Sequence, residues 1–235
     1  MLILAFETSA KAAGVALHDG TKLLAEAYQN TGLTHSQTLM VMAEDLLKQC
    51  GYKPQEVTHV AVAAGPGSFT GVRIGVAAAK GFAWGMEIPC YGISTLEAMA
   101  KNLGIYEGVV CAVMDARRSQ VYNGLFRVEK GVYTPICPDR AISLADLETQ
   151  LHQIQAPIYL VGDGSVLTYH TLGDKISNLI LPPEHRLHQR AAGVALAALE
   201  KINAGEAADA ATLEPNYLRL SQAEREKLER NAKEN

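Results

Sequence analysis

Several features that would point to particular classes of protein are scarce or missing in this sequence. Cysteine occurs only four times in 235 residues and never as a Cys-x-x-Cys pair, which indicates a reduced protein. No apolar run approaches the roughly 20 residues that a membrane-crossing helix needs. The apolar residues 1–6 meet Glu7 too soon for a signal peptide. We therefore expect a cytoplasmic protein with no membrane role.

An excess of basic residues is also absent. The chain has 21 Lys and Arg against 25 Asp and Glu, a net charge of -4 and a pI near 6.0. Such a balance gives no general attraction to polyanions, so any contact with RNA must be a local patch or belong to a partner. With 48% hydrophobic residues and only 9 prolines, the chain suits one large or two small globular domains.

What is present is a repeated order of strands and helices. In the first half, the pattern predicts three short antiparallel strands, a helix and a buried strand at residues 2–8, 12–18, 22–28, 34–50 and 57–64. The second half repeats this order at residues 109–115, 121–128, near 133, 143–153 and 158–161. A glycine turn follows the last strand of each half, namely Gly65-Pro66-Gly67-Ser68 and Gly162-Asp163-Gly164-Ser165. The halves therefore look duplicated.

This duplicated α/β plan resembles the actin-like, sugar-kinase and Hsp70-type ATPase superfamily, in which ribonuclease H-like halves face each other across a cleft. The resemblance at this level concerns fold and does not fix function. We expect an N-terminal lobe at residues 1–104, a second, degenerate lobe at 105–213 and a charged, helical C-terminal tail at 214–235.

Two carboxylates and two glycines mark the expected position of a ligand. Glu7 and Asp115 each close the first strand of a half, and Gly67 and Gly164 lie in the two glycine turns. Strand ends of this kind would face the cleft, so these four residues form a possible degenerate nucleotide cleft. The carboxylates could hold a Mg²⁺-nucleotide or could simply cap the turns after their strands. The glycine spacing fits neither known phosphate cradle, which favours a structural turn.

The helix that starts near Gly71 carries small residues at every fourth position, and Gly81 and Gly85 repeat this spacing on a neighbouring stripe. Glycine costs about 1 kcal/mol against alanine in a helix interior, so something must pack closely here, either the protein's own sheet or a partner. The preceding helix, 36–50, is apolar on more than one face, which favours a partner.

These two helices are therefore the candidate partner interface, and we expect no catalytic residue. The expected interface residues are Leu39, Met42, Ala43, Leu46, Gly71, Arg73, Gly75, Ala79, Lys80 and Ala83.

Four motifs together resemble the bacterial TsaB (YeaZ) family. They are Phe6-Glu7-Thr8-Ser9, Thr34-His35-Ser36, the stretch 65–75, and Pro215-Asn216-Tyr217-Leu218-Arg219. The match spans nearly the whole chain, and the stretch 65–75 is the most specific part. The resemblance implies a non-catalytic scaffold and dimerisation subunit of the complex that threonylcarbamoylates the tRNA adenosine next to the anticodon.

The resemblance also implies partners. The chain would bind and activate a TsaD-like catalytic subunit through the two helices, alongside a TsaE-like ATPase, and would form a homodimer when alone. It would reach tRNA only through the complex. No intrinsic cofactor is implied, because ATP or ADP and metal would belong to the partner subunits.

The metal motif of the catalytic relative is missing. Its His-x-Glu-Gly-His motif aligns with Thr95-Leu96-Glu97-Ala98-Met99 here. Thr and Met cannot replace two imidazoles on Zn²⁺ or Fe²⁺, which disfavours an M22-type metallopeptidase. The remaining alternative function is an ATP-dependent small-molecule phosphotransferase that uses the Glu7/Asp115 cleft.

Overall fold

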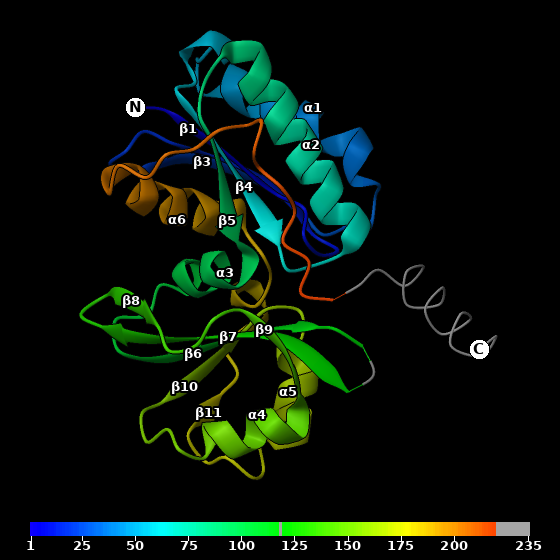
Figure 1. Ribbon diagram of the computed structural model, residues 1–235, viewed down its shortest axis with the longest axis vertical. Helices are drawn as coiled ribbons and strands as arrows, with labels where there is room; N and C mark the ends of the chain where they lie inside the picture. The colour runs from blue at the N-terminus through cyan, green and yellow to red at the C-terminus, as the bar shows by residue number, and fades with distance from the viewer. Residues whose placement is uncertain (118, 220–235) are drawn as a thin grey trace, which may run out of the picture.

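The structure is a computed structural model that describes residues 1–117 and 119–219, and it has two lobes, each built on a mixed β-sheet (Figure 1). The first lobe contains β1 (Ile3–Glu7), β2 (Ala13–His18), β3 (Leu23–Gln29), α1 (His35–Gln49), the 3-10 helix η1 (Pro54–Glu56), β4 (His59–Gly65), α2 (Phe69–Met86), β5 (Cys90–Ser94) and α3 (Thr95–Leu103).

The second lobe contains β6 (Gly108–Asp115), β7 (Gln120–Glu129), β8 (Val132–Pro135), β9 (Arg140–Ser143), α4 (Leu144–Leu151), β10 (Ile158–Val161), α5 (Ser165–Leu172) and β11 (Leu179–Ile180). The 3-10 helix η2 (Glu184–Arg186) and α6 (Ala191–Asn203) follow.

Strand β1 lies at the centre of the first sheet, whose order is β3-β2-β1-β4-β5. It pairs antiparallel with β2 and parallel with β4, and all of its residues are buried. Burial on both faces explains why β1 and β4 are continuous apolar runs. Because β1 and β4 are parallel, they bring Glu7 and the glycine turn 65–68 to the same edge of the sheet.

The second sheet repeats this arrangement in the order β11-β10-β6-β7-β8, with β9 also paired to β7. Strand β6 is antiparallel to β7 and parallel to β10, as β1 is to β2 and β4. The edge of this sheet therefore brings together Asp115 and the second glycine turn, 162–165. The predicted duplicated actin-like fold is confirmed.

Helices and sheets alternate in layers (Figure 1). Helices α1 and α2 cover one face of the first sheet, and α6 with part of α3 covers the other. Helix α3 also packs on one face of the second sheet, while α4 and α5 pack on the opposite face. Helix α3 therefore contributes to the cores of both lobes.

The strands and helices predicted for the two halves are confirmed at nearly the same boundaries. The predicted extent of the second lobe, 105–213, is wrong at its C-terminal end. Helix α6 packs on the first sheet, where Ala191, Val194 and Ala198 lie against β1 residues such as Ile3 and Ala5. Its alanine-rich face allows this close packing, so the chain returns to the first lobe after η2.

The predicted helical tail also differs from the structure. Residues 214–219 contain no helix, and they contact the body of the protein. The backbone N–H of Asn216 donates to the carbonyl oxygen of Ala64 at 2.6 Å, and the ring of Tyr217 stacks on that of Phe69. The rest of the predicted tail, 220–235, lies outside the described residues.

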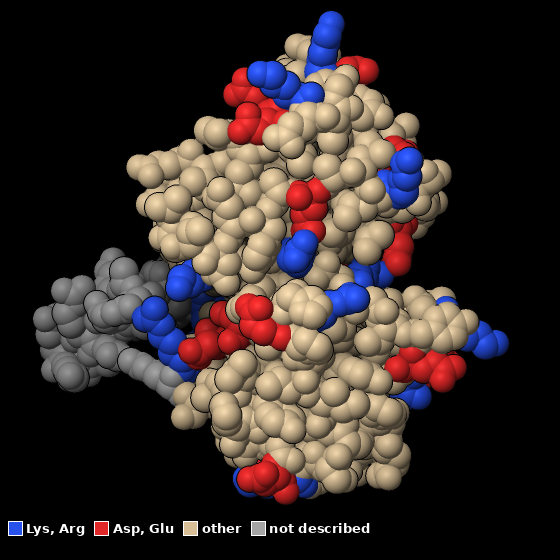
Figure 2. All heavy atoms as spheres, turned by 180° about the vertical axis from the view of Figure 1, so that it is seen from behind, with Lys and Arg blue, Asp and Glu red and all other residues tan. Residues whose placement is uncertain are grey.

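Two surface properties bear on function. Within residues 1–117 and 119–219, no helix is long and apolar enough to cross a membrane. On the face shown in Figure 2, basic and acidic side chains lie next to one another and do not form a broad basic patch.

Candidate functional site

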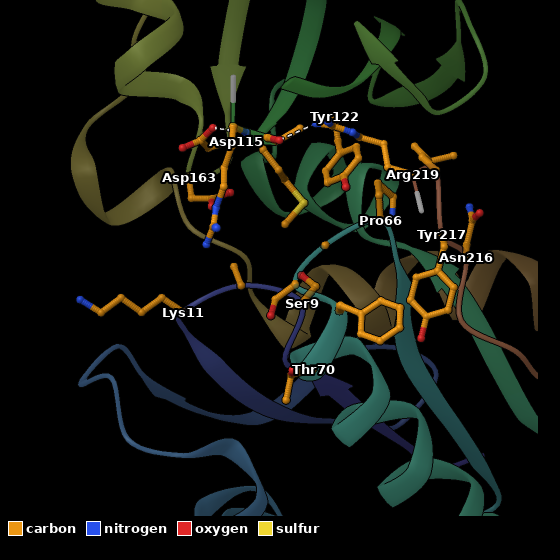
Figure 3. Close-up of a pocket in the computed structure, with 18 residues that line it drawn as sticks. Ser9, Lys11, Pro66, Thr70, Asp115, Tyr122, Asp163, Asn216, Tyr217 and Arg219 are labelled. Atoms are coloured by element: carbon orange, nitrogen blue, oxygen red, sulfur yellow. Dashed lines mark hydrogen bonds between the residues drawn. The ribbon is translucent and has the colours of Figure 1, made fainter. Parts of the chain in front are cut away.

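A cleft of about 540 Å³ lies between the two lobes. Ser9, Lys11 and Thr70 line it from the first lobe, and Asp115 and Asp163 line it from the second (Figure 3). The residues come from strand ends and the turns after them, so the position of the cleft follows from the duplicated topology.

Glu7 lies beneath this cleft and does not line it. Its side chain is fully buried, and its Oε1 atom accepts a hydrogen bond from the backbone N–H of Ser9 at 2.6 Å. Burial raises the pKa of the Glu7 carboxyl to about 7, an effect that hydrogen bonds to Ser9 partly oppose. The carboxyl therefore caps the turn after β1.

Asp115 also caps its own turn in the second lobe, where its exposed side chain accepts a hydrogen bond through Oδ1 from the backbone N–H of Arg117 at 2.7 Å. Asp163 also lines the cleft, and its Oδ1 atom accepts a hydrogen bond from Gln189 Nε2 at 2.8 Å. Desolvation raises the pKa of Asp163, although the hydrogen bond from Gln189 opposes this. Sequence reasoning did not single out Asp163, although it lies inside the second glycine motif.

The first glycine turn packs against the protein's own backbone. A Cβ atom on Gly67 would overlap the carbonyl oxygen of Ser9, which also accepts a hydrogen bond from the N–H of Ser68 at 2.6 Å. A Cβ atom on Gly65 would overlap the carbonyl oxygen of Asn216. Close backbone approach therefore explains why these positions are glycine.

Gly164 has the same explanation in the second turn. A Cβ atom there would lie 3.0 Å from the carbonyl carbon of Met114 and 3.1 Å from the nitrogen of Asp115. Of the four residues predicted for a degenerate nucleotide cleft, only Gly67 and Asp115 line the cleft. The geometry thus matches the turn-capping alternative.

The small residues on α2 face the protein's own sheet. A Cβ atom on Gly71 would overlap the carbonyl oxygen of Thr8, and one on Gly75 would overlap Thr8 Oγ1. Ala79 and Ala83 are fully buried in the same core. The prediction that this stripe is open to a partner is wrong, because β1 passes so close to α2 that larger side chains would not fit.

The α1 residues predicted for the interface are also in the core, with Leu39, Met42, Ala43 and Leu46 all 7% exposed or less. They cover the first sheet together with α2. A side chain already packed inside the protein offers no surface to a partner, so these four assignments are wrong as well.

The two charged residues of the predicted interface contact the C-terminal segment. Lys80 Nζ donates to the carbonyl oxygen of Leu213 at 2.8 Å. Arg73 is exposed, and its Nε donates to the hydroxyl of Tyr217 at 2.7 Å. Both side chains therefore have intramolecular partners.

Other residues of α1 and α2 point outward and are apolar. Met40 is 43% exposed, Val41 56% and Trp84 70%, and a Cβ atom on Gly81 or Gly85 would meet nothing within 4 Å. We call these five residues the docking face. The every-fourth-residue spacing of Gly81 and Gly85 was the sequence signal for this face. The buried stripe of α2 has the same spacing, so the sequence alone could not distinguish the exposed stripe from the buried one.

Metal ligands do not gather in the described part of the chain, where no group of three or more His, Cys, Asp or Glu could hold a metal ion. The segment 95–99, aligned with the metal motif of the catalytic relative, forms the start of α3. Thr95, Leu96, Ala98 and Met99 are buried there in the core.

Comparison with known proteins agrees with these observations. The family described as "TsaD: tRNA N6-adenosine threonylcarbamoyltransferase" matches residues 29–227. The chain is 35% identical to the Bacillus subtilis tRNA threonylcarbamoyladenosine biosynthesis protein TsaB over 230 residues, covering 97% of this chain and 99% of that protein. The chain belongs to the TsaB (YeaZ) family, which is related to TsaD.

Further TsaB relatives extend the likeness. The Escherichia coli TsaB protein is 32% identical over 223 residues, covering 93% of this chain and 95% of that protein. A solved structure of YeaZ from Pseudomonas aeruginosa superposes with a TM-score of 0.75 at 25% identity, covering 92% of this chain and 99% of that one. The likeness spans both lobes.

Proposed function

We propose that this chain is a non-catalytic scaffold subunit in the biosynthesis of threonylcarbamoyladenosine in tRNA. It acts by docking a TsaD-like catalytic subunit on α1 and α2 and by holding that subunit in an active arrangement. Membership of the TsaB family supports the pathway, and the docking face supports the mode of action.

The observation that carries the docking assignment is the outward surface of α2. Trp84 is 70% exposed, and the two neighbouring glycines Gly81 and Gly85 have open space above them. A large apolar side chain beside small residues suits close packing of a second helix, and such exposed apolar surface is typical of interaction sites. Met40 and Val41 add exposed apolar side chains on α1.

The geometry of the cleft supports a non-catalytic role. Glu7 and Asp115 accept hydrogen bonds within their own turns, and the protein's own backbone lies close to Gly65, Gly67 and Gly164. We therefore do not favour the phosphotransferase alternative. We expect no intrinsic cofactor, with ATP or ADP and metal on the partner subunits, a cytoplasmic location, a homodimer when the chain is alone, and a TsaE-like ATPase as a third partner. Contact with tRNA would run through the complex.

The variant Gly81→Arg tests docking. It places a long charged side chain on the docking face without an internal clash, since nothing lies within 4 Å of the Cβ position. Light scattering of the variant mixed with a TsaD-like subunit should give separate proteins where the wild type gives a complex, and tRNA modification by the reconstituted complex should fall with it. Circular dichroism should be unchanged.

A matched control is Leu196→Arg, on an exposed position of α6, which covers the opposite face of the first sheet. It should leave both complex formation and tRNA modification at the wild-type level. Gly75→Leu is unsuitable, because the new side chain would collide with Thr8 and unfold the protein. Normal complex formation by Gly81→Arg would show that the partner binds elsewhere.

A further inference from the structure

The C-terminal segment 211–219 follows α6 along the first lobe and bonds to it at several points. The N–H of Asn216 donates to the carbonyl oxygen of Ala64, at the end of β4, at 2.6 Å. The side chain of Leu213 packs against Gly92 on β5, where it occupies the place of a Cβ atom. Lys80 on α2 donates to the carbonyl oxygen of Leu213 at 2.8 Å. The segment is therefore held along the edge of the first lobe.

The same segment then stacks on the first turns of α2. The rings of Tyr217 and Phe69 stack with their centroids 4.6 Å apart and their planes inclined by 28°. The guanidinium carbon of Arg73 lies 3.9 Å from the Phe69 ring centroid, and Arg73 Nε donates to the Tyr217 hydroxyl at 2.7 Å. Aromatic stacking and a cation over a ring both stabilise such a cluster, so Tyr217 is held by two different α2 side chains.

Two residues further on, the segment reaches the second lobe. Arg219 Nη1 donates to the carbonyl oxygen of Ala116 at 2.6 Å, in the turn between β6 and β7. Asn216, Tyr217 and Arg219 lie together along one end of the interlobe cleft in Figure 3. A hydrogen bond from a charged donor is stronger than a neutral one, so this contact is a substantial link across the cleft.

We propose that residues 216–219 form a strap that closes one end of the cleft and fixes the two lobes relative to each other. Helix α3, packed on both sheets, and the hydrogen bond from Ser94 to Asp139 connect the lobes elsewhere. The strap adds a further connection at the end of the cleft, which opposes a hinge motion of the lobes. The proposal concerns the chain alone and does not depend on docking to a partner.

The variant Arg219→Ala in the full chain tests the strap. It removes the bond to the second lobe and leaves the contacts with α2 in place. Hydrogen exchange measured by mass spectrometry should become about tenfold faster in the turn between β6 and β7, because this turn loses its bond to Arg219. Small-angle X-ray scattering should show a larger radius of gyration.

Two further variants complete the test. Arg127→Ala removes an exposed arginine of the second lobe that forms an ion pair with Glu129 at 4.0 Å, and it should change neither measurement. Tyr217→Phe keeps the ring stack and loses only the bond to Arg73, so the radius of gyration should stay at the wild-type value. Unchanged exchange and scattering in Arg219→Ala would overturn the proposal, as would a larger radius in Tyr217→Phe than in Arg219→Ala.

Discussion

The buried carboxyl of Glu7 gives the protein a stability that should depend on pH in an unusual direction. Its pKa rises from 4.5 to about 7 on folding, mainly because burial disfavours the charged form. Below pH 4.5 the group is protonated in both states. Between pH 4.5 and about 7 the unfolded chain ionises while the folded protein keeps its proton, so stability falls as pH rises. Above about pH 7 the loss is complete.

The size of this loss of stability follows from the difference between the two pKa values. A change in pKa from 4.5 to about 7 corresponds to about 3 kcal/mol, a large fraction of the stability of a typical domain. The variant Glu7→Gln cannot ionise and keeps an oxygen that can accept from the Ser9 N–H. Its amide nitrogen takes the place of Oε2, a buried atom without a hydrogen-bond partner, which costs about 1 kcal/mol. The variant should therefore be about 2 kcal/mol more stable than wild type at pH 8.

Urea unfolding of wild type and Glu7→Gln at pH 5, 6, 7 and 8, at one protein concentration, measures this effect. The free energy of unfolding of wild type should decrease across the range relative to that of the variant. The control Glu129→Gln, at an exposed site on β7, should follow the wild-type curve. Parallel curves for Glu7→Gln and wild type would refute the reasoning, because they would mean that Glu7 binds no extra proton in the folded state.

Two other predictions follow from burial. Gly75→Ala should lower the free energy of unfolding by about 2 kcal/mol, because the new methyl group would overlap Thr8 Oγ1, whereas Gly81→Ala should raise it by up to about 1 kcal/mol on the open side of the same helix. Chemical denaturation of the pair checks this, and equal effects at both sites would contradict the packing described for α2. Burial also raises the pKa values of Cys90 and Cys111 to about 12, so alkylation followed by mass spectrometry should modify these thiols only after unfolding. Labelling of either thiol in the native protein would contradict its burial.

Much of this protein could be predicted from the order of its residues. Apolar runs at residues 2–8 and 109–115, each followed by a polar turn, are enough to indicate a central strand of a sheet. The repeat of that pattern indicates the duplicated fold, because the same local sequence in both halves forms the same local structure. The motif at 65–75 identified the family, and the same sequence pattern drew attention to α1 and α2.

The site needed the tertiary structure. Gly75 and Gly81 both belong to stripes of small residues with the same period, and only the position of β1 decides that Gly75 is covered and Gly81 open. Helix periodicity gives the faces of a helix but not their orientation toward the sheet.

The same reason applies to Glu7 and to the C-terminal segment. A carboxylate after a strand can face a ligand or its own turn. The carboxylate of Glu7 faces its own turn, because it accepts a hydrogen bond from the backbone N–H of Ser9. A charged C-terminal tail can be solvated or can pack on the protein. In its described part, Tyr217 stacks on Phe69 of α2. The sequence by itself determined which segments form strands and helices, since those depend on neighbouring residues. The tertiary structure alone decided which surfaces remain exposed, because exposure depends on contacts between residues far apart in the chain.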